Sequence, residues 1–364
     1  MRILFFLGHP AQYLFLKNTL LQLEKNPAIQ FKILIKKKDV LEKLIIEDGF
    51  SYENVLMEER SEGWLGIIKS FSVRFFRIFK IAIKYKPDLF WSGDPATTFI
   101  GRLLGKGAIV VGEDDYPVIY KLARITYPFA TAIICPNVCD VGSYKNKKIG
   151  YDGYMKLAYL HPSVFVFNEN VLTKYIKSKK YALVRLSELK AYHDDGIGGV
   201  TEDILDELVV ILNKRGFDVF ISSEGKINEK YVNHLIKPNP SDMVHILAGA
   251  SIFIGDSQSM TVEACMLGIP SIRFSGLAGK ISVLEELEHK YKLTFGINCL
   301  DKEALISTLE TLVTVDDFKK DFLNRRDVML KDKINVSEYI TSLITNYPYS
   351  LETELNVYNR KSPF

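Results

Sequence analysis

The stretch Ile254-Gly-Asp-Ser-Gln-Ser-Met-Thr-Val-Glu-Ala-Cys-Met-Leu-Gly-Ile-Pro270 decides the fold of the second half of the chain. An apolar run ends at Ile254, and a turn of small polar residues follows it. A helical segment then runs to Leu267, where Gly268 and Pro270 both signal a helix end. A buried strand, a polar turn and a helix in this order are typical of parallel α/β sheets, in which ligands bind beyond the carboxyl ends of the strands.

The same alternation runs through the rest of the chain. Solidly apolar runs predict strands that are buried on both faces, because a one-sided antiparallel sheet would show alternating polar residues. The predicted strands are residues 3–7, 31–35, 88–91, 108–111 and 131–134, then 181–184, 218–221, 251–254 and 271–274. Helix-period segments are predicted at residues 202–214, 242–247 and 260–267, with closing helices at 302–312 and 336–345.

The length of 364 residues is enough for two domains of ordinary size. We therefore predict an α/β fold of two Rossmann-like domains that face each other across a cleft. The first domain is expected at residues 1–160. A linker is expected at 161–180, a second Rossmann-like domain at 181–345 and a tail at 346–364.

Composition excludes several classes of function. The net charge of +3 does not suggest a nucleic-acid-binding protein, which usually shows a stronger basic bias concentrated in one stripe. The spacing of the four cysteines does not complete a zinc site, so no bound metal and free thiols in a reducing compartment are expected. The first apolar run is too short for a signal peptide, and no run approaches the roughly 20 apolar residues that span a bilayer. A cytoplasmic location is expected, with attachment to the inner membrane face as an option.

The turn at residues 255–259 has the features of an anion site. Backbone N–H groups at the start of the following helix, with the hydroxyls of Ser257 and Ser259 and the Gln258 amide, would hold a diphosphate. Glu263 lies one helical turn after Ser259 on the same face, where its carboxylate would accept the hydroxyls of a ribose. The alternative is a capped helix whose serines bind its own N–H groups and whose Glu263 is solvated.

This segment resembles a known donor site. Asp256-Ser-Gln-Ser, Glu263-Ala and Leu267-Gly-Ile-Pro270 are similar to the motif of GT-B glycosyltransferases and of the related non-hydrolysing UDP-N-acetylglucosamine 2-epimerases. The resemblance implies GT-B architecture and a nucleotide-sugar substrate, with UDP as the expected nucleotide and no other cofactor required.

The chain resembles more closely a prokaryotic GT-B-like family whose chemistry is uncharacterised. The resemblance extends over Gly8-His-Pro-Ala, Gly93-Asp-Pro-Ala, Gly112-Glu-Asp-Asp115, Gly150-Tyr-Asp-Gly-Tyr154, Leu157-Ala-Tyr-Leu-His-Pro162, Arg185, His193-Asp194 and Ile221-Ser-Ser-Glu224. It covers both halves of the chain, but it does not identify the reaction.

Three residues at strand ends of the first half are candidates for catalysis. His9 follows the first strand and is a candidate general base, since an unperturbed imidazole titrates near neutral pH. Several inverting GT-B transferases carry a histidine in the corresponding loop. Asp94 and Glu113 end two other strands, in segments similar to catalytic segments of the epimerases. The alternative for His9 is a purely structural residue.

Two departures weaken the epimerase interpretation. The loop at residues 8–12 lacks the arginine of the epimerases' Gly-Thr-Arg-Pro-Glu loop, and residues 185–195 replace their His-Arg-Arg-Glu-Asn stretch. In this region Arg185 is the candidate for a second phosphate contact, with a salt bridge to a nearby acid as the alternative. His193 is a candidate for orienting the leaving diphosphate, or belongs to an ordinary turn.

Residues 64–84 form a basic segment with apolar residues at helical spacing. Such a helix suits peripheral contact with an anionic membrane and a lipid-linked acceptor, although most amphipathic helices pack on a sheet. We predict a glycosyltransferase that uses a nucleotide-sugar donor and a glycan or lipid-linked acceptor in cell-surface polysaccharide or glycoconjugate assembly. The alternatives are a nucleotide-sugar 2-epimerase and a non-catalytic nucleotide-sugar-binding protein.

Overall fold

The computed structural model describes residues 1–36, 39–56, 63–187, 198–315 and 317–361. The chain forms two compact units, one of Met1–Val164 with Ile334–Phe364 and the other of Phe165–Lys333. Each unit contains one parallel β-sheet covered by helices. The predicted α/β class with two Rossmann-like sheets is confirmed.

The first unit is built on a seven-stranded sheet with the order β3-β2-β1-β4-β5-β6-β7. All of its neighbouring strands pair in parallel. The strands are β1 (Arg2–Leu7), β2 (Gln30–Lys36), β3 (Tyr52–Leu56), β4 (Leu89–Trp91), β5 (Gly107–Val111), β6 (Ala132–Pro136) and β7 (Lys148–Tyr151). The strand order reverses between β1 and β4, which makes this pair the topological switch point of the sheet.

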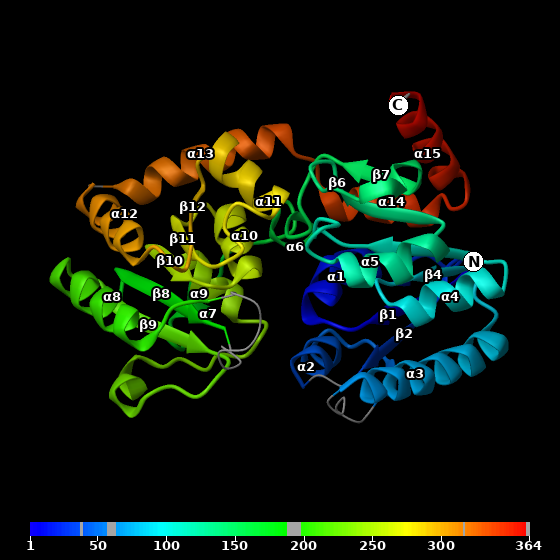
Figure 1. The fold of residues 1–364 in the computed structure, drawn as a ribbon, viewed down its shortest axis with the longest axis horizontal. Coiled ribbons are helices and arrows are strands. Elements are labelled where there is room, and N and C mark those ends of the chain that lie inside the picture. The colour runs from blue at the N-terminus through cyan, green and yellow to red at the C-terminus, as the bar shows by residue number, and fades with distance from the viewer. Residues whose placement is uncertain (37–38, 57–62, 188–197, 316, 362–364) are drawn as a thin grey trace. The chain divides into compact units, whose positions relative to one another are not determined.

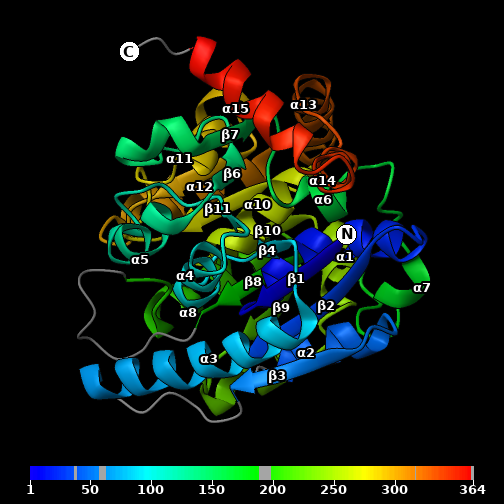
Figure 2. The ribbon, with the colours of Figure 1, turned by 90° about the vertical axis from the view of Figure 1, so that its right-hand side faces the viewer.

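Helices pack on this sheet because its strands are apolar on both faces. Leu4, Phe6, Phe90 and Ala108 form one buried cluster with Ile78 of helix α3, and Figure 2 shows α3 and α4 side by side in front of the strands. The helical elements are α1 (Pro10–Glu24), α2 (Asp39–Glu47), α3 (Gly63–Tyr85), α4 (Pro95–Leu103), α5 (Tyr120–Thr126), η1 (Tyr127–Phe129), η2 (Gly142–Lys147), α6 (Leu157–Leu160), α14 (Val336–Thr345) and α15 (Tyr349–Lys361).

The second unit is built on a five-stranded parallel sheet with the order β12-β11-β10-β8-β9. Its strands are β8 (Tyr181–Leu186), β9 (Asp218–Ser223), β10 (Ile252–Gly255), β11 (Ser271–Phe274) and β12 (Thr294–Ile297). Phe253 and Ile254 on the central β10 are fully buried. The strand order reverses between β8 and β10.

Helices of the second unit cover both faces of this sheet (Figure 1). They are α7 (Glu169–Leu172), α8 (Glu202–Lys214), η3 (Glu229–His234), α9 (Met243–Gly249), α10 (Gln258–Leu267), α11 (Ser282–Glu285), the π-helical turn η4 (Glu286–Lys290), α12 (Lys302–Thr314) and α13 (Phe318–Asp332). No described helix has both the length and the apolar content needed to span a bilayer.

The C-terminal segment corrects the predicted domain boundaries. Residues 336–345 were predicted to close the second domain, but α14 packs on α1 and α6 of the first unit. The Thr19 hydroxyl donates to the Ser337 carbonyl across this contact, at 3.3 Å. The predicted tail contains α15, which contacts β7. The predicted linker is also divided, because the boundary between the units falls at Val164.

Candidate functional site

The switch point of the second sheet lies between β8 and β10. Arg185 and Gly255 are register neighbours on these strands. Just beyond them, the Ser187 N–H donates a 2.8 Å hydrogen bond to Asp256 Oδ1. Ligands of open parallel sheets bind beyond the carboxyl strand ends at such a point. The turn at residues 255–259 therefore occupies the place where a ligand of this unit is expected.

Helix α10 begins directly after this turn. Ser257 is its N-cap, and the Ser257 hydroxyl accepts a 3.4 Å hydrogen bond from the Met260 N–H. The N–H groups of Gln258 and Ser259 precede the first hydrogen bond within the helix and therefore have no acceptor in it. The helix ends at Gly268, whose φ of 69° lies in the left-handed region that favours glycine. The first turn thus offers two N–H groups and the positive end of the helix dipole to an anion.

One face of α10 is partly exposed while the rest of the helix is buried. Thr261, Val262 and every residue from Ala264 to Leu267 are buried, whereas Ser259 and Glu263 are half-buried. Ser259 and Glu263 are four residues apart and therefore lie on the same face. This partly exposed face carries the hydroxyl and the carboxylate that the sequence predicts for binding of the diphosphate and the ribose.

Gln258 has a structural environment that the sequence did not indicate. Its Nε2 donates to the Ser275 hydroxyl at 2.8 Å and to the Asp256 carbonyl at 3.2 Å. Its Oε1 accepts a 2.7 Å hydrogen bond from Nη1 of Arg273, which is fully buried. The Gln258 side chain therefore fixes the turn at residues 255–259 from inside the unit.

Arg185 forms the salt bridge that was the alternative to a phosphate contact. Its Nη1 donates to the Ser222 hydroxyl at 2.6 Å, and its Nη2 lies 2.5 Å from the Glu224 carboxylate. Arg185 is largely buried, whereas Glu224 is exposed. The predicted contact at His193 lies outside the described residues.

Asp256 lies against Gly199 beside the switch point. Burial raises the pKa of its carboxyl, and the hydrogen bond from the Ser187 N–H opposes this. Its Oδ2 is buried without a hydrogen-bond partner among the described residues. A Cβ atom at Gly199 would lie 2.3 Å from this oxygen. Glycine at position 199 lets the chain pass directly over the carboxylate.

His9 is placed at the switch point of the first sheet, after β1. It is exposed and is the N-cap of α1, where its Nδ1 accepts a 3.2 Å hydrogen bond from the Ala11 N–H. Because Nδ1 is the acceptor, the neutral ring carries its proton on Nε2. In this arrangement Nε2 is a hydrogen-bond donor, and a role as general base would require the cap to open.

Asp94 lies after β4, as His9 lies after β1, but each of its two carboxylate oxygens already has a partner. Its Oδ1 accepts from the Ala96 N–H at 2.9 Å as the N-cap of α4, and its Oδ2 lies 3.1 Å from Arg74 Nε. Burial raises the pKa of the Asp94 carboxyl, and the Arg74 charge opposes the shift. Asp94 therefore has a structural role, since it caps α4 and pairs with Arg74.

Glu113 follows β5 and forms an ion pair with Lys156, which follows β7. The exposed fractions are 13% for the Glu113 side chain and 5% for Lys156, so the pair is largely removed from water. Glu113 Oε2 also accepts from the Met155 N–H at 3.1 Å. Loss of hydration and then the Glu113 charge raise the pKa of the neighbouring Asp114 carboxyl.

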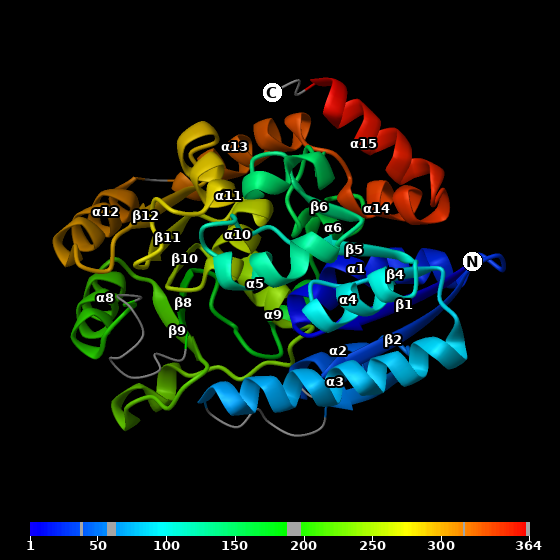
Figure 3. The ribbon, with the colours of Figure 1, turned by 45° about the vertical axis from the view of Figure 1, so that its right-hand side comes forward.

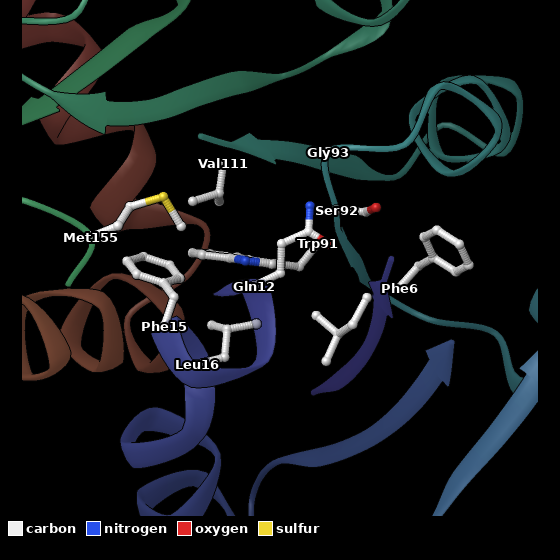
Figure 4. A pocket seen from close by; sticks show the side chains of 10 residues that line it. Phe6, Gln12, Phe15, Leu16, Trp91, Ser92, Gly93, Val111 and Met155 are labelled. Carbon is white, nitrogen blue, oxygen red and sulfur yellow. The ribbon is translucent and has the colours of Figure 1, made fainter. Parts of the chain in front are cut away.

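A small cavity lies beside these strand ends (Figure 4). Gln12 closes one side of it, and the Gly8 N–H donates to Gln12 Oε1 at 2.8 Å. Its volume is about 10 Å³, which is too small for a sugar and fits about one water molecule. The lining residues are Phe6, Leu7, Gln12, Phe15, Leu16, Trp91, Ser92, Gly93, Val111 and Met155.

The described residues include one group with potential metal-binding atoms. Glu285, Glu288 and His289 offer three such atoms within 4.8 Å of one another. Glu285 already lies 3.6 Å from Arg273 and 3.1 Å from His289. Glu288 accepts from the Gly296 N–H at 2.9 Å. These ion pairs and hydrogen bonds are enough to explain why the three side chains lie close together.

A family model described as "Protein of unknown function (DUF354)" matches residues 106–337, which is more than half of the chain. The chain belongs to this family. The matched range contains Glu113, Lys156 and the whole turn and helix at residues 255–267. No curated protein sequence matches the chain.

Solved structures place the DUF354 chain among proteins of GT-B-like architecture. The UDP-GlcNAc 2-epimerase of Neisseria meningitidis, bound to UDP-GlcNAc, has a TM-score of 0.70 at 14% identity over 95% of this chain and 100% of its own. The epimerase of Methanocaldococcus jannaschii scores 0.63 at 17% identity over 87% and 94%. A glycosyltransferase from Streptomyces sp. SF2575 scores 0.57 at 13% identity over 95% and 100%. At these identities the likeness shows the fold, and the predicted architecture is confirmed.

Two residues of the DUF354 chain's candidate sites were not found from the sequence. Lys156 lies two residues after the quoted motif Gly150–Tyr154, and the end of β7 would have marked it had this strand been recognised. Arg273 carries no signal, because an arginine inside an apolar strand gives no indication of its partner. Both act through other residues, Glu113 and Gln258.

Proposed function

We propose that the chain is a glycosyltransferase whose second unit binds a nucleotide-sugar donor at residues 255–263. One observation carries the proposal. At the switch point between β8 and β10, the first turn of α10 presents the N–H groups of Gln258 and Ser259, and the partly exposed face of the same helix presents Ser259 and Glu263. Diphosphate and ribose are the two parts of a nucleotide that need such groups.

The diphosphate binds at the N-terminus of α10. Its charge is offset by the two N–H groups, the Ser259 hydroxyl and the helix dipole. Glu263, one turn further along, accepts hydrogen bonds from the ribose hydroxyls. UDP is the favoured nucleotide because proteins that share the fold have been solved with UDP-GlcNAc or UDP.

The other donor-side residues have supporting roles. Gln258 and Arg273 hold the turn in place, so the N–H groups are oriented before the ligand arrives. Arg185 stands at the end of β8 in an ion pair with the exposed Glu224. In the proposal a diphosphate competes with Glu224 for the Arg185 guanidinium, which is geometrically suited to bind two oxygens.

The acceptor chemistry belongs to the strand ends of the first unit. Glu113, held by Lys156, orients an acceptor hydroxyl through its carboxylate, and His9 Nε2–H donates to an oxygen of a substrate. Asp94 supports the loop as the cap of α4. The acceptor is a glycan or lipid-linked sugar of cell-surface polysaccharide or glycoconjugate assembly.

A nucleotide-sugar 2-epimerase is the second candidate. The Neisseria epimerase gives a higher TM-score than the Streptomyces transferase, 0.70 against 0.57. Against it stands the loop at residues 8–12, where Gln12 bonds to the Gly8 backbone and the arginine of the epimerases is absent. A non-catalytic nucleotide-sugar-binding protein is the third candidate.

Product analysis separates the three candidates. The donor that binds best is incubated with the protein, alone and with a mixture of glycan and lipid-linked acceptors. Transfer predicts free nucleotide and a glycosylated product only when an acceptor is present. Interconversion of two nucleotide sugars without acceptor would replace the proposal by epimerisation. Binding with neither product, across the acceptors tested, would favour the non-catalytic protein.

A further inference from the structure

Helices α3, α4 and α5 of the first unit carry positive charges only. Together they carry eight lysines or arginines and no aspartate or glutamate. The whole chain has a net charge of only +3. Figures 2 and 3 both show α4 between α3 and α5 on one side of the seven-stranded sheet. A strong local excess of positive charge therefore lies on one surface of this unit.

The same surface exposes large apolar side chains. Phe76 and Ile83 of α3 are 67% and 51% exposed, Leu103 of α4 is 59% exposed and Ile125 of α5 is 54% exposed. Scattered exposed apolar residues are ordinary on soluble proteins, but grouping on adjacent helices is not.

Aromatic contacts connect Phe76 of α3 with α4 and with η1. The ring of the exposed Phe76 lies 5.6 Å from Phe75, which lies 5.8 Å from Phe99 on α4. Phe99 in turn lies 5.0 Å from Phe129 of η1. A chain of ring contacts therefore runs from α3 across α4 to η1, which directly follows α5.

Cations border this apolar surface along α3. Successive residues of an α-helix are rotated by about 100°. The side of α3 that carries the exposed Phe76 and Ile83 therefore also carries three lysines, Lys69, Lys80 and Lys84, and it lies opposite the buried side of the helix. Arg74 is not part of this row, since it pairs with Asp94. An exposed helix face with aromatic and aliphatic residues beside lysines matches helices that lie in a membrane interface.

A groove lies beside the row of Lys69, Lys80 and Lys84, on the side away from Phe76 and Ile83. It has a volume of about 690 Å³ and lies between α3 and the strands β2 and β3. Arg77, Lys80 and Lys84 line it together with Lys32, whose ammonium lies 3.4 Å from Glu53. Phosphate headgroups fit a groove of this charge while acyl chains meet the apolar side of the helix.

We propose that the surface formed by α3, α4 and α5 binds the interface of an anionic phospholipid bilayer. The charge argues against a second copy of the chain as the occupant. A two-fold contact would bring the same cations against one another. A polyanion such as nucleic acid would pair with the lysines, but it would not account for the exposed Phe76, Ile83 and Leu103. The proposal does not depend on the nucleotide-sugar site.

Vesicle co-sedimentation of the full chain tests the surface. Neutral phosphatidylcholine vesicles are compared with vesicles that also contain phosphatidylglycerol, at low and high salt. Binding is expected with the anionic vesicles only and weakens at high salt, because anionic surfaces attract lysines and salt screens that attraction. Equal binding to both kinds of vesicle, or no binding to either, would overturn the proposal.

Two double variants then separate the apolar and the ionic parts. Phe76→Asp with Ile83→Asp, and Lys80→Glu with Lys84→Glu, are each expected to weaken binding to anionic vesicles at least about tenfold. Val210→Asp, at a residue of α8 that is 65% exposed, is the matched control and should bind like the wild type. Circular dichroism and melting temperature confirm that each variant is folded.

The outcomes of these variants are distinct. Loss of binding in the lysine variant alone would reduce the surface to a polyanion site and contradict insertion of Phe76 and Ile83. Concentration-dependent dimerisation that the Phe76 and Ile83 variant abolishes would identify a second copy as the occupant. Either result would overturn the membrane proposal.

Discussion

Lys156 and Glu113 form an ion pair that joins the carboxyl ends of β7 and β5 in the first unit. Both side chains are largely buried, and the backbone of Met155 donates to the same carboxylate. The pair therefore positions the acid that the sequence nominated for catalysis. It also means that a substitution of Glu113 has a structural effect besides any effect on chemistry.

Removing one partner of this pair should destabilise the first unit. Lys156→Met removes the positive charge that faces Glu113, and Glu113→Gln removes the negative charge that faces Lys156, so each is expected to lower the free energy of unfolding by about 3–5 kcal/mol. The double variant should lose less than the sum of the two. Urea denaturation of all four proteins measures this coupling, and additive losses would show that the two charges do not interact.

His9 caps α1 through Nδ1, and in the proposed function its Nε2–H donates to the substrate. Two substitutions separate these two roles. His9→Asn keeps a side-chain oxygen for the Ala11 N–H, so its stability should stay close to that of the wild type. His9→Ala removes the cap and should cost about 0.5–2 kcal/mol. Activity should fall in both variants, because both lack the Nε2 donor. Full activity of His9→Asn would restrict His9 to capping.

Gly199 should tolerate no side chain. Gly199→Ala would place a Cβ atom 2.3 Å from Asp256 Oδ2, so the chain or the carboxylate must shift, at a cost of about 1–3 kcal/mol. Gly112→Ala is the control, since no atom lies within 4 Å of its added Cβ. Melting temperatures of the two variants test the contact. Equal melting temperatures would show that the strand end at Asp256 adapts freely.

Asp256→Asn should stabilise the second unit at neutral pH. Burial raises the pKa of the Asp256 carboxyl above its ordinary value of 3.8, so the folded protein binds more protons than the unfolded chain between these two pKa values. The wild type therefore loses stability as the pH rises through that window.

Asparagine carries no such charge and keeps an oxygen for the Ser187 N–H. The advantage of Asp256→Asn should be about 1–3 kcal/mol at pH 7 and should shrink as the pH falls towards 3.8. Chemical denaturation at several pH values measures it. An advantage that is independent of pH would assign the effect to packing instead of charge.

One helix of each unit could be predicted closely because its periodicity and its end signals agree. The predicted bounds 202–214 and 336–345 match α8 and α14. The packing partner of α14 could not be predicted, since an apolar helix face does not reveal which sheet it covers. The strands β3, β7 and β12 were missed. They are short, and β3 reads Tyr-Glu-Asn-Val-Leu, without a continuous apolar run.

The candidate sites show the same division between local and long-range information. Chain position alone placed serines at the start of α10 and Glu263 one turn after Ser259, although the helix begins at Gln258, two residues before the predicted start. Arg273, Glu224 and Arg74, which contact Gln258, Arg185 and Asp94, lie 15, 39 and 20 residues away from them, so no local pattern could reveal these three contacts.

Ligand-induced stabilisation tests the nucleotide-sugar site most directly. Melting temperature or calorimetry is measured with a panel of nucleotide sugars for the wild type, Glu263→Ala and the control Glu310→Ala, an exposed acid on α12. We predict that a UDP-sugar at 100 times its Kd stabilises the wild type and Glu310→Ala by about 2.7 kcal/mol. Glu263→Ala should lose most of this gain. Equal stabilisation of Glu263→Ala, or no stabilisation of the wild type by any nucleotide sugar, would contradict the account.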